Sequence, residues 1–302
     1  MSGAADAAAA LAAGRLVILP TETVYGLAAD AANPAAVAAL YEAKERPSFN
    51  PLIAHVFDLA AARAIAALDS RAVALAEAFW PGPLTLVAPS KGGVSDLARA
   101  GLDTVAVRAP AHPLARAVLA AFGGPVAAPS ANRSGRPSPT TFADAVAETG
   151  GAAAVALDGG PCAVGLESTV ISLLDGPPRL LRPGAVTRAE IEALIGPLAE
   201  AEADARRSPG RLARHYAPAA PLRLEATEAR PDEAFIGFGA IGSADLNLSP
   251  AGDLAEAAAR LFSYLRAADA RAPIAIAVAP IPRHGLGEAI NDRLQRASGL
   301  VG

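Results

Sequence analysis

The chain lacks several features that mark whole classes of protein. It has one cysteine in 302 residues, Cys162, which excludes an intramolecular disulfide and any zinc site with several cysteine ligands. No apolar stretch reaches the roughly 18 residues that a transmembrane helix needs. The first residues, Met-Ser-Gly-Ala-Ala-Asp, include no basic segment, so no secretory signal is predicted. These absences predict a cytoplasmic protein without membrane contact.

Lysine is also scarce, which draws attention to the places where it occurs. Lys44 and Lys91 stand against 24 arginines in a chain of net charge −4, whose many alanines raise its apolar fraction to 52%. Asparagine occurs five times and histidine four times. Short segments rich in glycine and proline that gather these rare residue types are therefore the candidates for a functional site.

Motifs of several common chemistries are missing. The chain contains no Gly-x4-Gly-Lys-Ser/Thr, no His-Glu-x2-His and no Gly-x-Ser-x-Gly. Gly237, Gly239 and Gly242 fit a dinucleotide-binding spacing, but residues 243–250 are typical of a loop rather than of the helix that would receive a pyrophosphate. Nothing near Cys162 offers a base, and the histidines lack ligand spacing. We therefore predict neither a covalent nucleophile nor protein ligands to a metal.

Residues 1–200 alternate between strand and helix patterns. Apolar runs predict strands at 16–19, 52–56, 84–88, 104–108, 126–128, 154–157, 168–173 and 180–182. Helical spacing predicts helices at 4–13, 34–43, 59–68, 70–79, 112–122 and 187–195. Strands interleaved with helices predict an α/β domain with a largely parallel or mixed sheet.

The pattern changes near residue 199. Residues 199–221 have the composition of a linker, with acidic and then basic residues, so we place a linker or lid at 201–221. A second, smaller α/β domain is predicted at 222–302. Its elements are strands near 222–225, 234–238 and 274–279, and helices at 253–268 and near 287–297.

Two polar segments follow early elements of the first domain. The segment 20–26, Pro-Thr-Glu-Thr-Val-Tyr-Gly, lies just beyond a strand, where open α/β sheets bind ligands. A tight turn explains its proline and glycine, but not two threonines around a glutamate. The segment 44–55 gathers Lys44, Arg46 and His55. The two cations suit an anion clamp, and a solvated helix end is the alternative.

Two later segments have a similar character. Residues 129–140 are rich in serine, arginine and glycine, which suits a phosphate cradle of backbone N–H groups and hydroxyls. A disordered Ser/Pro linker is the alternative, disfavoured by the strands and helices around it. Residues 165–170 again put polar groups at a strand end, and Arg108 and Arg182 each close a strand.

Taken together, these segments predict a concave site of Lys, Arg, Ser, Thr and Asn without a protein nucleophile. Such a site suits a nucleotide together with a small anionic or zwitterionic molecule. Catalysis would come from positioning and charge neutralisation, with a nucleophile carried by the substrate. The residues alone leave nucleotidyl transfer, kinase chemistry and simple binding open.

Seven stretches carry a family resemblance: PTETVYGLAADA, KERPSFNPLIAH, PGPLTLV, DTVAVRAP, PVAAPSANRSGRPSPT, GLESTVI and LLRPGAV. In this order they resemble the YrdC-type threonylcarbamoyl-AMP synthases, and SPGRLARHYAP and GLGEAINDRL resemble the longer, two-domain form of that family. The resemblance covers nearly the whole chain. It implies a YrdC-like twisted mixed sheet with helices around a concave cavity, plus a smaller Rossmann-like C-terminal domain.

The resemblance implies a nucleotidyltransferase activity. L-Threonine, bicarbonate and ATP would give threonylcarbamoyl-AMP and pyrophosphate, with Mg²⁺ accompanying ATP. The product would serve the threonylcarbamoyladenosine modification of tRNA at position 37, through a downstream transferase.

The same resemblance assigns roles by motif position. L-Threonine would be held by Thr23, His55, Arg108, Ala128 and Ser168, with Arg108 as the partner of its carboxylate. ATP would be held by Arg46, Asn50, Thr104, Ser130, Ser138, Arg182 and Tyr216. Lys44 and Arg46 would be the catalytic pair, with Lys44 assisting at the phosphates or bicarbonate.

Tyr216 resembles a linker residue that reaches back over the nucleotide, which would make the linker a lid. Residues 211–214 depart from the Met/Lys-rich run expected before His215, which leaves the other contacts of the lid open.

Two alternative functions remain: a non-catalytic module that binds double-stranded RNA or tRNA, and carbamoyl transfer from carbamoyl phosphate. The negative net charge and the absence of an aromatic stacking platform count against the first. The absence of zinc-finger and acylphosphatase-like regions counts against the second.

Overall fold

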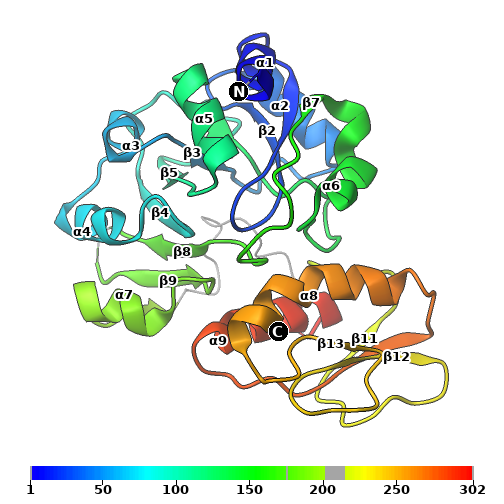
Figure 1. Ribbon diagram of the computed structural model, residues 1–302. Helices are drawn as coiled ribbons and strands as arrows, with labels where there is room; N and C mark the ends of the chain where they lie inside the picture. The colour runs from blue at the N-terminus through cyan, green and yellow to red at the C-terminus, as the bar shows by residue number, and fades with distance from the viewer. Residues whose placement is uncertain (1, 175, 201–214, 301–302) are drawn as a thin grey trace.

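Two sheets with their helices make up the part of the chain that the structure describes, residues 2–174, 176–200 and 215–300 of a computed structural model (Figure 1). The larger sheet contains β1 (Leu16–Leu19), β2 (Gly26–Asp30), β3 (Ile53–His55), β4 (Leu84–Pro89), β5 (Thr104–Arg108), β6 (Val126–Ala127), β7 (Ala153–Ala156), β8 (Thr169–Ser172), β9 (Arg179–Arg182) and β10 (Ala199–Glu200). The order across this sheet is β10-β9-β8-β4-β5-β3-β6-β2-β1-β7. The smaller sheet follows it in the chain.

The larger sheet contains both parallel and antiparallel pairs, so it is mixed, as predicted. β3 pairs parallel with β5, which sets His55 beside Arg108 at their carboxyl ends. β4 runs antiparallel to β5 and parallel to β8, and β9 runs antiparallel to β8. The ends of β3, β5 and β9 therefore meet the beginnings of β4 and β8 at one edge of the sheet.

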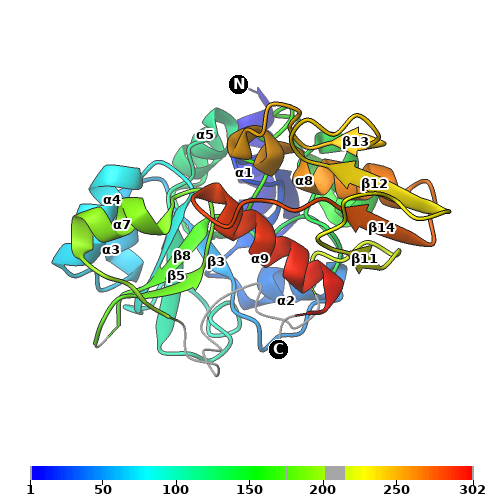
Figure 2. The ribbon, with the colours of Figure 1, turned by 90° about the horizontal axis from the view of Figure 1, so that it is seen from below.

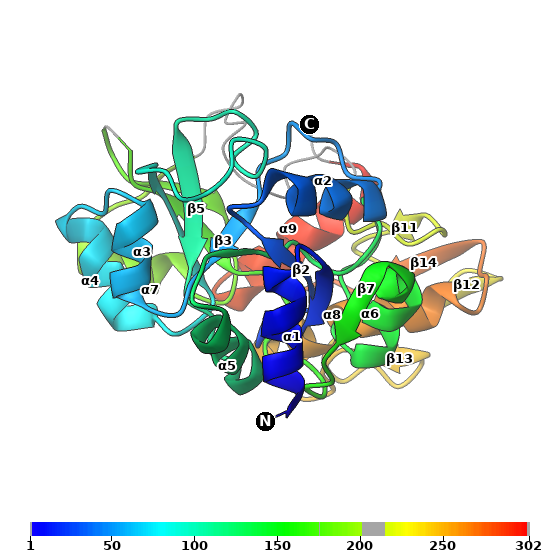
Figure 3. The ribbon, with the colours of Figure 1, turned by 90° about the horizontal axis from the view of Figure 1, so that it is seen from above.

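Helices cover this sheet and enclose its core. They are α1 (Ser2–Ala12), α2 (Pro34–Ala43), α3 (Leu59–Ile65), α4 (Ser70–Phe79), α5 (Pro113–Phe122), α6 (Phe142–Thr149) and α7 (Arg188–Ile195). In the view from above, α1, α2, α5 and α6 lie in front of the strands (Figure 3). Local sequence sets their ends: Asn33 caps α2 ahead of Pro34, and Thr187 and Glu190 form a capping box at α7.

The second unit consists of a small parallel sheet and two helices (Figure 2). Its strands are β11 (Leu222–Arg223), β12 (Glu233–Gly237), β13 (Leu246–Asn247) and β14 (Ala275–Val278), in the order β11-β14-β12-β13. Its helices are α8 (Leu254–Asp269) and α9 (Leu286–Ser298). In Figure 1, both helices lie between the small sheet and the first domain.

The predicted strands and helices of both domains are present, with bounds shifted by a few residues. Of the helices and strands in the described residues, β2, α6, β10 and β13 were not predicted, and neither was the 3₁₀ turn at Gly150–Ala152. The glycines at 237–242 follow β12 and open no helix, because α8 begins only at Leu254. Most of the predicted linker, residues 201–214, lies outside the described residues, including the departure at 211–214. No helix in the described ranges is long and apolar enough to cross a membrane.

Candidate active site

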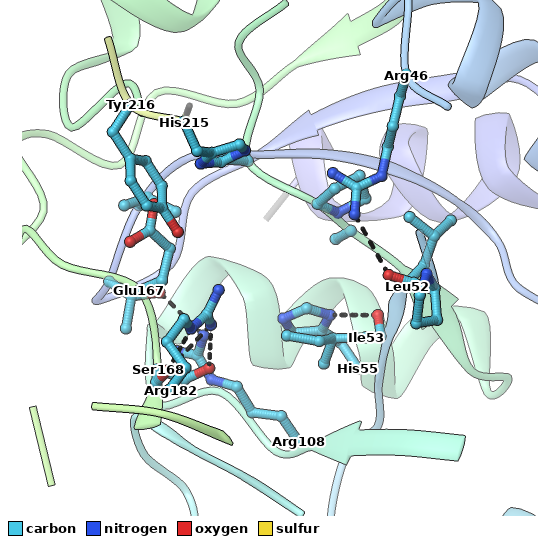
Figure 4. Close-up of a pocket in the computed structure, with 16 residues that line it drawn as sticks. Arg46, Leu52, Ile53, His55, Arg108, Glu167, Ser168, Arg182, His215 and Tyr216 are labelled. Atoms are coloured by element: carbon cyan, nitrogen blue, oxygen red, sulfur yellow. Dashed lines mark hydrogen bonds between the residues drawn. The ribbon is translucent and has the colours of Figure 1, made fainter. Parts of the chain in front are cut away.

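A cavity lies at the edge of the larger sheet where the ends of β3, β5 and β9 meet. The residues on the opposite side of the cavity come from the start of the second unit. It is lined by Thr23, Val24, Arg46, Pro51, Leu52, Ile53, His55, Arg108, Ala128, Pro129, Ser130, Glu167, Ser168, Arg182, His215 and Tyr216. The cavity has a volume of about 50 Å³, so its interior is narrow. Figure 4 shows charged and aromatic side chains surrounding this space.

Arg108 is fixed on three sides. Its Nε donates to the carbonyl of Gly82 at 3.1 Å, its Nη1 to the Thr23 hydroxyl at 2.9 Å, and its Nη2 to Glu22 Oε1 at 2.5 Å. Burial opposes ionisation of Glu22, but the Arg108 charge and the hydrogen bonds from Arg108 and from backbone N–H groups together outweigh it, so the pKa of Glu22 is lowered. Of the five guanidinium N–H groups, two remain for a ligand.

His55 lies beside Arg108 as a neutral ring. Its Nδ1 is 3.2 Å from the carbonyl oxygen of Ile53. Burial, aided by the nearby Arg108 charge, lowers the pKa of His55 to about 3. The side chain is therefore uncharged at neutral pH and offers hydrogen bonds rather than charge.

Arg182 fixes Ser168 on the other side of the cavity. It donates to the Ser168 carbonyl from Nε at 3.1 Å and from Nη2 at 2.9 Å, and Nη2 lies 3.2 Å from the Ser168 hydroxyl. That hydroxyl also shares a hydrogen bond of 2.7 Å with Thr85 on β4. Ser168 is thus held between two elements with its side chain at the cavity wall.

Arg46 and Arg182 carry charges that no carboxylate compensates within ion-pair distance in the described ranges. Arg46 Nη2 donates to the carbonyl of Pro51 at 3.3 Å, and its buried Nε has no partner there. Burial lowers the pKa of Arg46 to about 10, so it is still a cation at neutral pH. Within the described ranges no carboxylate pairs with Arg46, and the carboxylate that acts on Arg182, Glu167, already pairs with Arg293, so the excess of positive charge makes the cavity a site for an anion.

Tyr216 and His215 close the cavity from the side of the second unit. The two rings contact edge to face, with centroids 4.0 Å apart. The buried Tyr216 hydroxyl and His215 Nδ1 have no hydrogen-bond partner among the residues described. Burial and the cations around it, Arg46 foremost, lower the pKa of His215 well below its usual value. Unsatisfied polar atoms that line a cavity indicate a missing ligand.

Lys44 lies behind this wall. It follows α2 and its buried ammonium donates to the carbonyls of Ser130 and Asn132. Burial lowers its pKa well below the usual value. In this structure Lys44 therefore holds the segment 129–140 in place and does not line the cavity.

Nine of the thirteen predicted site residues line the cavity: Thr23, Arg46, His55, Arg108, Ala128, Ser130, Ser168, Arg182 and Tyr216. Four do not: Lys44, Asn50, Thr104 and Ser138, all buried. Ser138 donates its hydroxyl to Glu167, which is part of the wall. Thr104 begins β5, four residues before Arg108 and hence about 13 Å away along the strand.

Three polar residues of the site were not predicted as ligands. Glu167 and His215 line the cavity, and Glu22 holds Arg108. Each lies next to a predicted residue, since Glu22 precedes Thr23, Glu167 precedes Ser168 and His215 precedes Tyr216. Their positions within the polar segments were the feature of the sequence that could have identified them as site residues.

The Cys162 thiol is buried, and its burial raises its pKa to about 12, so it is protonated at neutral pH. A protonated thiol is a weak nucleophile.

Two family models match the sequence. One, the Sua5/YciO/YrdC model described as "Telomere recombination", matches residues 9–184. The other, described as "Threonylcarbamoyl-AMP synthase, C-terminal domain", matches residues 186–299. A threonylcarbamoyl-AMP synthase of Bacillus subtilis is 41% identical over 98% of this chain and 92% of that protein. The chain belongs to the threonylcarbamoyl-AMP synthase family.

Other members of the family agree. The threonylcarbamoyl-AMP synthase of Pyrococcus abyssi is 40% identical over 95% of this chain and 91% of its own length. A crystal structure of P. abyssi Sua5 complexed with L-threonine has a TM-score of 0.91 and 37% identity, covering 98% of this chain and 94% of that one. The predicted family, α/β fold and transferase activity of the chain are confirmed.

The two buried neutral histidines predict a stability that depends on pH. Below pH 6.5 an unfolded histidine takes up a proton that His55 and His215 refuse in the folded state, so stability is lost as the pH falls. Between pH 6.5 and 5 we expect the free energy of unfolding to drop by up to about 1.4 kcal/mol per pH unit for each histidine.

Urea denaturation of the H55Q variant at several pH values measures this. The slope should fall by roughly half in H55Q, and should be unchanged in H284Q, whose histidine is exposed. A slope equal to that of the wild type in H55Q would contradict the assignment.

Proposed function

We propose that the chain forms threonylcarbamoyl-AMP and pyrophosphate from L-threonine, bicarbonate and ATP. The observation that carries this proposal is that Arg46 and Arg182, which form no ion pair in the described ranges, lie in one cavity with Arg108. A triphosphate supplies the missing negative charge. The carboxylate of threonine suits the two free N–H groups of Arg108, whose own charge is already balanced by Glu22.

The reaction balances without a protein nucleophile. The threonine amine combines with bicarbonate to give a carbamate, with loss of water. A carbamate oxygen then attacks the α-phosphorus of ATP, the bond to the β-phosphate oxygen breaks, and pyrophosphate leaves. Arg46 and Arg182 stabilise the negative charge that accumulates on the departing phosphates. Holding both reactants in one cavity makes the attack effectively unimolecular.

The amino acid side of the site is formed by Thr23, His55, Arg108, Ala128 and Ser168, and the nucleotide side by Arg46, Ser130, Arg182 and Tyr216. Asn50, Thr104 and Ser138, predicted as nucleotide contacts, are buried outside the cavity and would reach ATP only if its wall moved, and Lys44 assists by holding the loop of Ser130. His55, being neutral, can accept or donate a hydrogen bond to threonine without competing for its carboxylate.

Mg²⁺ would enter with ATP. Glu167 is the carboxylate among the described lining residues, and it is bound by Arg293 and Ser138. The oxygens of the triphosphate, rather than protein carboxylates, would therefore hold the ion. Its chemistry when bound is to neutralise phosphate charge.

The narrow interior has a mechanical consequence. Because Tyr216 and His215 take up one side of a cavity with little free volume, two substrates need these side chains to move. We propose that the segment beginning at His215 opens for entry and closes over the nucleotide, which would keep water from the labile mixed anhydride.

The product would serve threonylcarbamoyladenosine formation at position 37 of tRNA through a downstream transferase. A non-catalytic RNA-binding role fits the cations of the site less well. Arg108 and Arg182 are buried and Arg46 is half-buried in a narrow cavity, whereas phosphates of a double helix need cations on an open surface.

The test is release of pyrophosphate by the purified chain with ATP, Mg²⁺, bicarbonate and L-threonine. We expect release only when all of these are present, and threonylcarbamoyl-AMP in equal amount by mass spectrometry. Pyrophosphate release that does not depend on threonine would refute the proposed function.

A further inference from the structure

The second unit contacts the first domain next to the nucleotide side of the cavity. Helices α8 and α9 form this contact (Figures 1 and 2). At Gly165 the approach is so close that an added Cβ would lie 2.4 Å from Ala259 Cα of α8. Gly165 has φ +74° and stands two residues before Glu167. This is tight packing of backbone on backbone beside the site.

Arg293 of α9 reaches through this contact and is fully buried. Its Nε donates to Glu167 Oε2 at 2.9 Å, and its Nη1 donates to Asp292 at 2.7 Å. Its guanidinium carbon lies 5.4 Å from the centre of the Tyr216 ring. The other oxygen of Glu167 accepts the hydroxyl of Ser138. One arginine of the second unit therefore joins Glu167, Ser138 and Tyr216.

Arg266 of α8 makes an equivalent contact with the first domain, at Pro137 in the segment 129–140 and at Glu148. It donates to Glu148 Oε1 at 2.9 Å and to the carbonyl of Pro137. Glu148 also accepts the backbone N–H of Arg133 at 3.1 Å. The segment 129–140 is thus held from both of the helices of the second unit.

The positive charge of Arg293 helps to keep the buried Glu167 carboxylate ionised. Burial opposes ionisation of Glu167, yet Arg293 and then Arg182 keep its pKa lowered. Without Arg293, Glu167 would be a buried carboxylate that draws Arg182 away from Ser168 or takes up a proton. Either change would disturb the wall of the cavity that faces the nucleotide.

We propose that Arg293 and Arg266 are positioning residues through which the second unit sets the shape of the nucleotide side of the site. This inference rests on the proposed function, since it takes that side of the cavity to bind ATP. Neither arginine lines the cavity. Arg293 acts through Glu167 and Tyr216, and Arg266 through Pro137 and Glu148.

The test compares R293M, R266M and R293K in the full chain with R260A as a control. Arg260 lies on α8, but its contacts are with Glu256, Leu248 and Tyr264 inside the second unit. We expect R293M to raise the KM for ATP about tenfold or more, because a displaced wall weakens every phosphate contact. The KM for threonine should change less than about threefold. R266M should raise the ATP KM less, R293K should recover part of the loss, and R260A should match the wild type.

A second variant separates positioning from charge balance. In E167Q/R293M no carboxylate is left unpaired, so the melting temperature should recover while the ATP KM stays high. A double variant with the wild-type ATP KM would show that Arg293 only balances a charge, and would overturn the proposal. R293M and R293K with equal increases in both KM values would do the same.

The failure of this inference is distinguishable from failure of the proposed function. A wild-type chain without threonine-dependent pyrophosphate release contradicts the function. In that case, titration calorimetry with ATP still reports on the arginines, with weaker binding in R293M expected. Equal ATP affinity in R293M and the wild type contradicts the inference alone.

Discussion

Replacing Arg108 with methionine is expected to raise the KM for L-threonine by about 100-fold, while the KM for ATP changes less than about threefold. Two N–H groups of Arg108, whose neighbours include Thr23 and His55, have no acceptor among the described residues, which suits a bidentate bond to a carboxylate. Two charge-assisted hydrogen bonds of about 1.5 kcal/mol or more each correspond to such a loss. The measurement is initial pyrophosphate release with each substrate varied in turn.

The R108M variant also leaves Glu22 without its partner, so the melting temperature must be read beside the kinetics. The double variant E22Q/R108M removes the unpaired buried charge. It should regain stability and keep the high threonine KM. R71M, in which a half-buried arginine paired with Asp69 far from the cavity lining is lost, is the matched control and should behave as the wild type. Equal increases in the threonine and ATP KM values would place Arg108 outside the amino acid site.

Local patterns were sufficient to predict most of the fold. Runs of branched apolar residues, such as 16–19 and 104–108, are the buried strands β1 and β5. β2 escaped notice because its residues, Gly-Leu-Ala-Ala-Asp, have little strand propensity and are held by pairing with β1 and β6. α6 was not predicted because it follows a Ser/Pro-rich segment, and the two stretches together resemble one long loop. Thr141 nevertheless caps this helix.

The sequence also indicated which segments meet at the site, since polar residues beyond strand ends of one sheet converge at an edge. It could not indicate which polar groups satisfy each other. Glu22 and Arg108 are 86 residues apart, and Glu167 and Arg293 are 126 apart. Lys44 was predicted to act on phosphates or bicarbonate, but its ammonium binds carbonyls that only the folded loop brings within reach. Such pairings depend on tertiary packing, which periodicity does not encode.

The uncompensated charge of Arg46 leads to the second large effect. We expect R46M to lower kcat/KM for ATP by about a thousandfold, because a buried cation at the phosphates is lost. The same substitution should leave the melting temperature unchanged or raise it. In the free protein the Arg46 charge is desolvated, its Nε lacks a partner within the described part of the chain, and no carboxylate there balances it. Methionine fills a similar volume without this cost.

K44M is the matched control for this prediction, since Lys44 is a buried cation that precedes Arg46 by two residues and does not line the cavity. Its loss leaves the carbonyls of Ser130 and Asn132 without their donor, so K44M should lower the melting temperature. Thermal denaturation with and without ATP separates the two: ATP should stabilise the wild type and not R46M. An R46M variant that is less stable than the wild type but still stabilised by ATP would mean that Arg46 supports the fold rather than the nucleotide. If R46M behaves as expected, ATP binding recovers the free-energy cost of desolvating the Arg46 charge.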